Sequence, residues 1–359
     1  MLAATAGIVV LTLVVRIAIA IANGFLPHDF LAYDGAVRHL LAGEPLYDTT
    51  ATATGKLGLF LYPPSFALLL LPVALVPTEL ASSIWVYLVI VAAVAAIWVL
   101  PVSWTIRWVL TIAMGLSAPL VGAIAQGQVG PLLFLLLALA WRYLDRPGVV
   151  GAALALGMTI KIQPVILVAW AIGTGRRRAA AIAIAGAAAV ALVATAFVGP
   201  GAWADLVSVL ARTNQPILTP NSVGIGRLAF EAGASETIST FLYAANIGLV
   251  AVAFVVAIRR ASPVASFLVG AVASQMISPV IWEHYAVVLF LPVAWLLSRG
   301  RRWAILILVA TSVPISTVVP HAIYPIAFWV ALLATLAEGM TAADAAPATE
   351  PPFPELAAS

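Results

Sequence analysis

Long apolar runs, almost free of charged side chains, dominate this chain of 359 residues. Charged residues make up 9% of the sequence and hydrophobic residues 64%, and the scarce charges fall mainly between the runs. A transmembrane helix needs about 20 apolar residues, since every backbone polar group must be satisfied inside the helix. The sequence therefore predicts an all-α polytopic membrane protein with roughly ten to twelve transmembrane helices.

The apolar runs divide the chain into a single predicted membrane domain, residues 1–340, and a predicted disordered tail, residues 341–359, rich in Ala, Pro, Thr and Glu. Two longer polar segments, 23–59 and 199–238, are predicted loops within that domain. The predicted spans are 3–22, 60–77, 81–100, 105–122, 129–143, 149–173, 179–198, 239–258, 263–281, 285–298, 303–319 and 322–337.

Clusters of arginine indicate the orientation of the chain, because basic residues in short loops mark the cytoplasmic side of a membrane. Three clusters are separated by even numbers of predicted spans and agree with one another: Arg176 to Arg178, Arg259-Arg260, and Arg299 to Arg302. The same count puts Arg107, Arg142 and Arg146 on the opposite side, which fits this rule less well. We expect a multi-pass plasma-membrane protein.

In this orientation the loops 23–59 and 199–238 and the junction 278–284 all lie on the extracytoplasmic side. Three polar segments on one face predict one functional site there. Carboxylates beside a membrane-embedded cavity are functional candidates, since burying an unpaired charge in hydrocarbon costs several kcal/mol.

The first of these loops contains a helical pattern. Apolar side chains recur at Tyr33, Ala36, Val37, Leu40 and Leu41, which predicts a short amphipathic helix lying on the membrane surface. Asp29 comes just before it and is either a helix N-cap or a functional carboxylate. Asp34 is either functional or paired with Arg38 four residues later.

Several segments, in order along nearly the whole chain, resemble glycosyltransferase family 87. They are Asp29-Phe30-x-x-Tyr33-x-x-Ala36, Leu41-x-Gly43, Leu46-Tyr47-Asp48, Phe60-x-Tyr62-Pro63-Pro64, Gly127-Gln128, Gly151 to Lys161 with Pro164 beyond, and Ser278-Pro279-x-x-Trp282-x-His284. The family often has a second histidine where this chain has Tyr285 after His284.

The resemblance implies a GT-C-type helical bundle that transfers a sugar, typically mannose, from a polyprenyl phosphate. The expected acceptor is a hydroxyl of a glycolipid or cell-envelope glycan, and direct attack inverts the anomeric carbon. A phosphate leaving group is already a stable anion, so this reaction needs no general acid. The acceptor hydroxyl does need a base, and the resemblance assigns that role to Asp29.

The departing phosphate needs fixed positive charge, for which Lys161, Arg227 and His284 are the candidates. Lys161 could instead be a lysine whose ammonium group extends from a helix end to the membrane surface. His284 could be a structural histidine bonded to Glu283. The resemblance adds a set of further donor-binding or substrate-binding residues: Tyr33, Asp34, Tyr62 and Gln128.

Other functional classes lack their motifs in this sequence. There is no cysteine, Walker A loop, Rossmann fingerprint, Asp-x-Asp motif or metal-ligand spacing, so neither a cofactor nor a metal site is predicted. No basic run interleaved with aromatics indicates nucleic acid. The main alternative is a transporter or lipid flippase, since interrupted helices and a buried lysine also fit a transport site; a non-catalytic membrane scaffold is a third.

Overall fold

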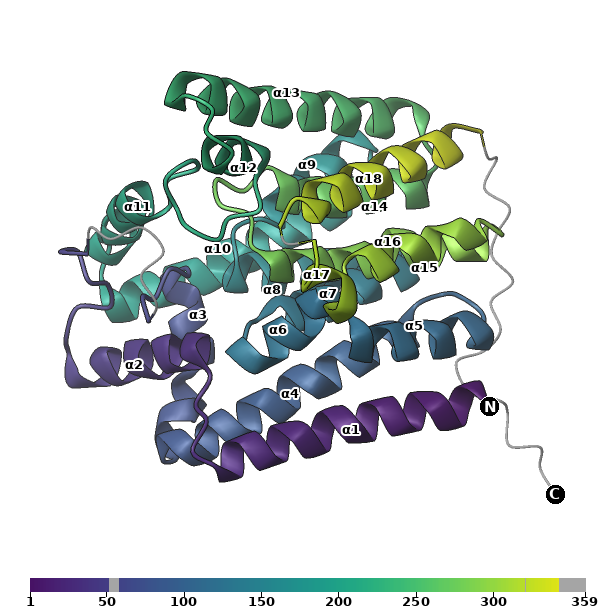
Figure 1. Ribbon diagram of the computed structural model, residues 1–359. Helices are drawn as coiled ribbons and strands as arrows, with labels where there is room; N and C mark the ends of the chain where they lie inside the picture. Colours follow the sequence, from purple (N-terminus) through teal and green to yellow (C-terminus); the bar gives the residue numbers. More distant parts are fainter. Residues whose placement is uncertain (52–57, 320, 342–359) are drawn as a thin grey trace.

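The computed structural model describes residues 1–51, 58–319 and 321–341, and within them every regular element is helical (Figure 1). This confirms the predicted all-α membrane class. Five helices are long and apolar enough to cross a membrane: α1 (Leu2–Ala22), α4 (Thr78–Val99), α10 (Arg177–Val198), α13 (Glu236–Arg260) and α18 (Ile323–Thr341). The predicted tail is 341–359, and its residues 342–359 lie outside the described residues.

Shorter helices make up the rest of the bundle. They are α2 (His28–Ala42), α3 (Pro64–Leu69), α5 (Trp104–Leu116), α6 (Ala118–Gln126), α7 (Gly130–Arg142), α8 (Pro147–Ile160), α9 (Val165–Gly173), α11 (Gly201–Thr213), α12 (Ile225–Glu231), α14 (Pro263–Met276), α15 (Phe290–Ser298), α16 (Ile305–Ala310) and α17 (Val313–Ser316). Three 3₁₀ segments are η1 (Leu71–Leu75), η2 (Glu283–Leu289) and η3 (Arg302–Ala304).

The predicted span 60–77 is wrong, because this segment is not one helix. It contains only α3 and η1. Pro63, Pro64, Pro72 and Pro77 supply no backbone N–H, so the helical hydrogen-bond ladder cannot run through the segment.

The predicted span 149–173 is also two helices, α8 and α9, separated at Lys161. Lys161 has extended backbone angles (φ −144°, ψ 144°), and Pro164 follows three residues later. α8 runs parallel to α10, because Gly151 lies against Ile182 and Gly186 lies against Ala155. A Cβ at Gly151 would come within 2.6 Å of Ile182, so this close approach requires glycine.

α9 then returns the chain to the end of the bundle from which α8 came. The guanidinium of Arg176, just after α9, lies 3.9 Å from the carboxylate of Asp145, just before α8. α8 and α9 therefore form a re-entrant hairpin rather than one crossing. Non-helical backbone at membrane depth is tolerated where it is buried in protein or lines a cavity.

With these two corrections, the helix ends that carry the arginine clusters lie at one end of the bundle, which we call the basic end (Figure 1). The basic end carries Arg107, Arg142, Arg146, Arg176, Arg177, Arg178, Arg259, Arg260, Arg299, Arg301 and Arg302. Arg107 donates to the carbonyl of Leu100, just after α4. Arg142 donates to the carbonyl of Val99, the last residue of α4.

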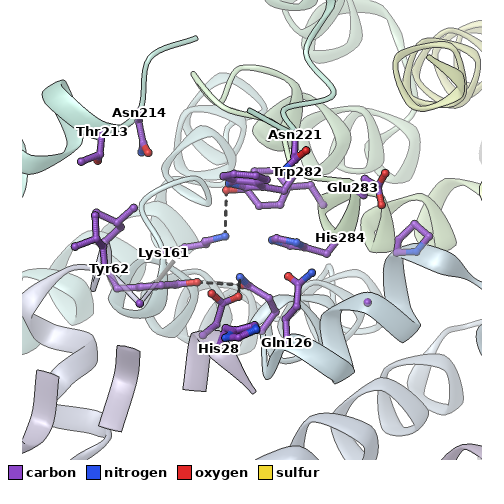
Figure 2. Close-up of a pocket in the computed structure, with 18 of the residues that line it drawn as sticks. His28, Tyr62, Gln126, Lys161, Thr213, Asn214, Asn221, Trp282, Glu283 and His284 are labelled. Carbon is purple, nitrogen blue, oxygen red and sulfur yellow. Dashed lines mark hydrogen bonds between the residues drawn. The ribbon is translucent and has the colours of Figure 1, made fainter. Parts of the chain in front are cut away.

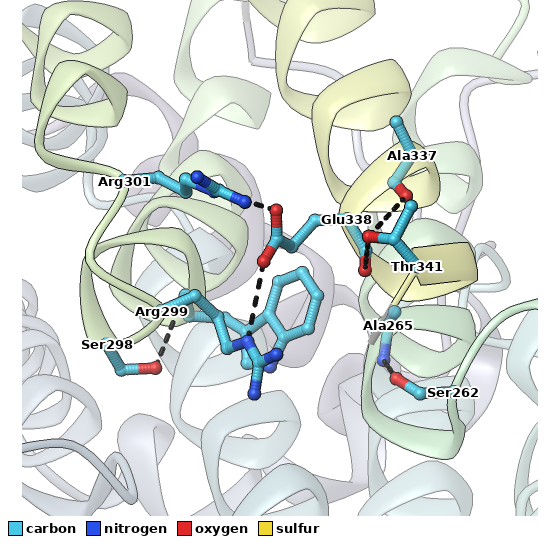
Figure 3. A network of polar contacts seen from close by, with 9 residues as sticks. Ser262, Ala265, Ser298, Arg299, Arg301, Ala337, Glu338 and Thr341 are labelled. Atoms are coloured by element: carbon cyan, nitrogen blue, oxygen red, sulfur yellow. Dashed lines mark hydrogen bonds and ion pairs between the residues drawn. The ribbon is translucent and has the colours of Figure 1, made fainter. Parts of the chain in front are cut away.

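The helix ends at the basic end are tied to one another by polar contacts (Figure 3). Glu338 of α18 lies 2.8 Å from Arg301 and 3.5 Å from Arg299, both just after α15. The Ser262 N–H, between α13 and α14, donates to the Gly339 carbonyl at 2.9 Å. These contacts hold α14, α15 and α18 together beside the cluster of arginines.

The opposite end carries α2 and α11, which come from the two predicted loops (Figure 1). α2 confirms the predicted short helix of the first loop, and Gly43 ends it with a left-handed backbone (φ 71°). Most of its predicted apolar face packs on the protein rather than on a membrane surface. Its apolar side chains Phe30, Tyr33 and Val37 are buried against protein, while Leu41 is exposed. Burial of this face fixes α2 across the end of the bundle.

Candidate active site

A cavity of about 490 Å³ lies beside α2 and α11, at the end of the bundle opposite the basic end. Figure 2 shows the side chains that line it. It brings together the three polar segments that the sequence predicted to share a site: the first loop, the second loop and the junction before α15. Its polar and aromatic lining comprises His28, Asp29, Tyr62, Gln126, Gln128, Lys161, Thr213, Asn214, Asn221, Trp282, Glu283, His284, Tyr285 and His321.

Asp29 lies in the first turn of α2 but does not cap it. The N-cap position is Pro27, and no side chain caps this helix. The carboxylate instead accepts a hydrogen bond from the amide of Gln128, and it lines the cavity. Burial raises the pKa of Asp29, while the charge of Lys161 and the hydrogen bond from Gln128 act in the opposite direction.

Lys161 reaches the cavity because α8 ends immediately before it. Its Nζ donates to the Tyr285 hydroxyl at 3.2 Å and lies 4.2 Å from the centre of the Tyr285 ring and 5.6 Å from that of Tyr62. Among the described residues, no carboxylate lies within 4.0 Å of this ammonium group. Its charge is therefore available to an anion in the cavity.

His284 also faces the cavity, and only 7% of its surface is exposed. Within the described part of the chain, its Nε2 is buried and has no hydrogen-bond partner. The structural pairing with Glu283 is not found, since Glu283 lies 3.3 Å from His321 instead. An unpaired buried imidazole nitrogen is costly, so it favours a ligand that completes the hydrogen bond.

Three of the predicted site residues do not line the cavity. Tyr33 is fully buried behind Tyr62 and donates to its hydroxyl. Asp34 accepts hydrogen bonds from Arg38 at 2.9 Å and Thr78 at 2.7 Å, the pairing that the four-residue spacing predicted.

Arg227 is also satisfied elsewhere. Its guanidinium lies 2.7 Å from Glu231, and it donates to the Ile217 carbonyl at 2.9 Å. The second loop instead contributes Thr213, Asn214 and Asn221 to the cavity. Of the three predicted cations, only Lys161 and His284 thus share a cavity with Asp29.

Sequence reasoning did not identify nine of the polar or aromatic lining residues as site residues: His28, Gln126, Thr213, Asn214, Asn221, Trp282, Glu283, Tyr285 and His321. Glu283 and Tyr285 flank the His284 motif, and Gln126 lies two residues before Gln128, so their positions beside motifs could have indicated them. His321 has no such neighbour. Within the described residues, no group of three His, Cys, Asp or Glu side chains is arranged to hold a metal ion.

Comparison with models of known protein families gives a match. The family model described as glycosyltransferase family 87 matches residues 60–279, whereas no curated protein matches the chain. The matched region contains Tyr62, Gln128 and Lys161; Asp29 and His284 lie outside it and join them only through the fold. Since the model covers more than half of the 359 residues, the chain belongs to glycosyltransferase family 87.

Proposed function

We propose that this glycosyltransferase moves a sugar, mannose by family resemblance, from a polyprenyl phosphate to a hydroxyl of a glycolipid or cell-envelope glycan. One observation carries the proposal. A carboxylate, Asp29, and an ammonium group, Lys161, face the same cavity without forming an ion pair with each other. Such a site can bind an anionic leaving group and deprotonate a neutral nucleophile.

In the proposed reaction, Asp29 is the general base. Its carboxylate takes the proton as the acceptor oxygen attacks the anomeric carbon; the acceptor O–H bond breaks and an Asp29 O–H bond forms. The new glycosidic bond forms as the bond from the anomeric carbon to the phosphate oxygen breaks, and that oxygen leaves with the electron pair. The attack inverts the anomeric configuration. A positioned base of this kind contributes about 10²–10⁴-fold to the rate.

Lys161 and His284 are the proposed ligands of the donor phosphate. The ammonium group of Lys161 supplies charge, and the unpaired Nε2 of His284 supplies a hydrogen bond when it carries a proton. Tyr285 holds Lys161 in place through its hydroxyl. In a partly dry cavity these groups stabilise the departing phosphate better than water does, because they are already oriented.

We further infer that the cavity faces the extracytoplasmic side of the plasma membrane. The positive-inside rule assigns the basic end to the cytoplasm. Residues of α2 and α11 line the cavity, and these two helices lie at the other end of the bundle (Figure 1). An exposed apolar surface surrounds the bundle, for example at Leu192, Phe197 and Phe241, so a lipid-linked donor would approach from the membrane.

A transporter or lipid flippase is the second candidate, favoured by the break between α8 and α9 that carries Lys161. Family membership and the position of the cavity at one end of the bundle favour transfer over transport. Purified protein should be incubated with radiolabelled polyprenyl-phosphate-mannose and total membrane lipids. Radioactivity in a new, solvent-extracted lipid or glycan supports transfer. Labelled donor that crosses a vesicle bilayer without forming product would instead support a flippase.

A further inference from the structure

A continuous series of hydrogen bonds leads from the protein interior to the carboxylate of Asp29. The Tyr33 hydroxyl donates to the Tyr62 hydroxyl at 2.9 Å, and the Tyr62 hydroxyl donates to Oε1 of Gln128 at 3.1 Å. The amide nitrogen of Gln128 then donates to Oδ2 of Asp29. We call these three residues, Tyr33, Tyr62 and Gln128, the relay; Figure 2 shows its Tyr62 beside the cavity.

The direction of every hydrogen bond in the relay follows from the charge of Asp29. An ionised carboxylate only accepts hydrogen bonds, so Gln128 must present its amide nitrogen to Asp29. The amide oxygen then faces Tyr62, which must donate to it. The Tyr62 oxygen in turn accepts from Tyr33, whose own oxygen lies near the backbone N–H of Val129. Each hydrogen bond in the series therefore has one defined donor and one defined acceptor.

The buried end of the relay is held rigidly. Tyr33 is fully buried and packs edge-to-face on Tyr62, Phe66 and Trp85, with ring centres 5.0, 5.3 and 5.6 Å away. The Trp85 indole donates to the Gly127 carbonyl at 2.7 Å. This contact fixes the peptide that precedes Gln128.

Gly127 also holds the loop after α6 against α2. Its backbone is left-handed (φ 70°), and a Cβ there would lie 3.0 Å from the Cβ atoms of Pro27 and Phe30. A larger residue would be strained in this conformation and would push Gln128 away from Asp29. Glycine at position 127 is therefore needed for Gln128 to reach Asp29.

We propose that Gln128, Tyr62 and Tyr33 are positioning residues, which hold Oδ2 of Asp29 and leave Oδ1 to take the acceptor proton. The inference rests on the proposed function and gives these residues a role other than contact with the donor. The relay itself neither gains nor loses a proton: the acceptor O–H bond breaks, and the new O–H bond forms on Oδ1. Tyr33 cannot contact substrate, because it is fully buried.

The relay also affects the proton affinity of Asp29. The charged or titratable groups that act on Asp29 are His28 on its own helix, Lys161 after α8, and the phenols of Tyr33 and Tyr62; His284 and Tyr285 face the same cavity from η2. The hydrogen bond from Gln128 favours the ionised form and lowers the pKa of Asp29. Without it the pKa rises, so activity should fall off at a higher pH on the acid side.

The test compares Gln128→Leu and Tyr33→Phe with a matched control, Tyr47→Phe. Tyr47 belongs to the same aromatic cluster and donates to the backbone carbonyl of Tyr62 at 2.7 Å, so its substitution also removes a buried phenol hydrogen bond to Tyr62. It leaves the side-chain hydrogen bonds of the relay in place. For each variant, kcat and the donor KM are measured across pH, and the melting temperature reports folding.

We expect Gln128→Leu to lower kcat by about 10- to 100-fold, to shift the acid limb to higher pH, and to leave the donor KM unchanged. Tyr33→Phe should also lower kcat and shift the acid limb to higher pH, but both effects should be smaller, because Gln128 remains. Tyr47→Phe should lower the melting temperature as much as Tyr33→Phe does, with the pH profile of the wild type.

A raised donor KM with an unshifted acid limb in Gln128→Leu would overturn the inference, because it would make Gln128 a substrate contact. Identical pH profiles of kcat in Tyr33→Phe and Tyr47→Phe would also overturn the inference, since both substitutions would then act only through stability. Failure of the proposed function is a separate result: the wild-type protein would transfer no sugar, or Asp29→Asn would transfer it at the wild-type rate.

Discussion

The guanidinium of Arg176 lies 3.9 Å from the carboxylate of Asp145, although α8 and α9 separate the two residues in the sequence. This contact shows that α8 and α9 form a hairpin, which enters and leaves the bundle at the same end. It also places Lys161 at the turn of the hairpin, where an extended backbone directs the side chain into the cavity.

The hairpin gives a direct topological prediction. The chain has no cysteine, so single cysteines can be introduced without a background signal. Asp145→Cys, at a side chain that is 98% exposed, should react with a membrane-impermeant maleimide only after the cells are permeabilised. Glu44→Cys, in the first loop, should react in intact cells. Labelling of Asp145→Cys in intact cells would contradict the corrected topology, and Arg301→Cys serves as a second marker of the basic end.

Asp29→Asn should abolish transfer while the protein stays folded and binds the donor. Loss of a general base costs about 10²–10⁴-fold in rate, and no helix cap is lost, since the side chain of Asp29 caps nothing. Rate is measured with saturating lipid donor, and folding by thermal unfolding in detergent.

Asp34→Asn is the companion variant, because Asp34 is an acidic residue of the same helix. It should lose stability through its contacts with Arg38 and Thr78 while transfer continues. If Asp34→Asn were inactive and Asp29→Asn active, the assignment of the base would be wrong.

The rate of transfer should depend on an acidic group whose pKa lies above the ordinary aspartate value of 3.8. Burial disfavours the charged form of Asp29, and Lys161 and Gln128 offset this effect only in part. The ionised form is the active one, so on the acid side the rate should rise with pH through this raised pKa and level off above it. A pH–rate profile of kcat checks it, and a profile that falls off only at or below pH 3.8 would argue against this base.

Lys161→Gln should reduce kcat/KM for the lipid donor by about 10²-fold or more, the usual cost of removing one group that stabilises developing negative charge. Arg227→Gln tests a second of the three predicted cations. We expect a much smaller effect, because Arg227 is satisfied by Glu231 and the Ile217 carbonyl. Donor binding should be measured with a non-transferable polyprenyl phosphate. Equal losses in the two variants would place the phosphate nearer the second loop.

The sequence alone determined the membrane class, the short helix α2 and the order of the motifs. These follow from local rules: the length of an apolar run, the helical period, and the spacing of residues within one motif. The pairing of Asp34 with Arg38 was also local, since residues four apart share one face of a helix.

The predicted number of membrane crossings contained two errors, and these cancelled each other. Counting 60–77 as a crossing inverted every later loop, and counting 149–173 as a crossing restored the order. Only the basic residues between the two segments, such as Arg107 and Arg142, were placed on the wrong end. Hydropathy could not reveal this, because a re-entrant hairpin and a long helix have the same apolar composition.

Only the tertiary structure decided which polar residues share the site. Asp29 and Gln128 are 99 residues apart and meet because Gly127 lets the loop after α6 approach α2. Lys161 and His284 face that cavity, whereas Arg227 is neutralised within its own helix. No periodicity in the sequence predicts such long-range contacts. They depend on how helices that are far apart in the sequence pack together, because close approach and steric fit select the partners.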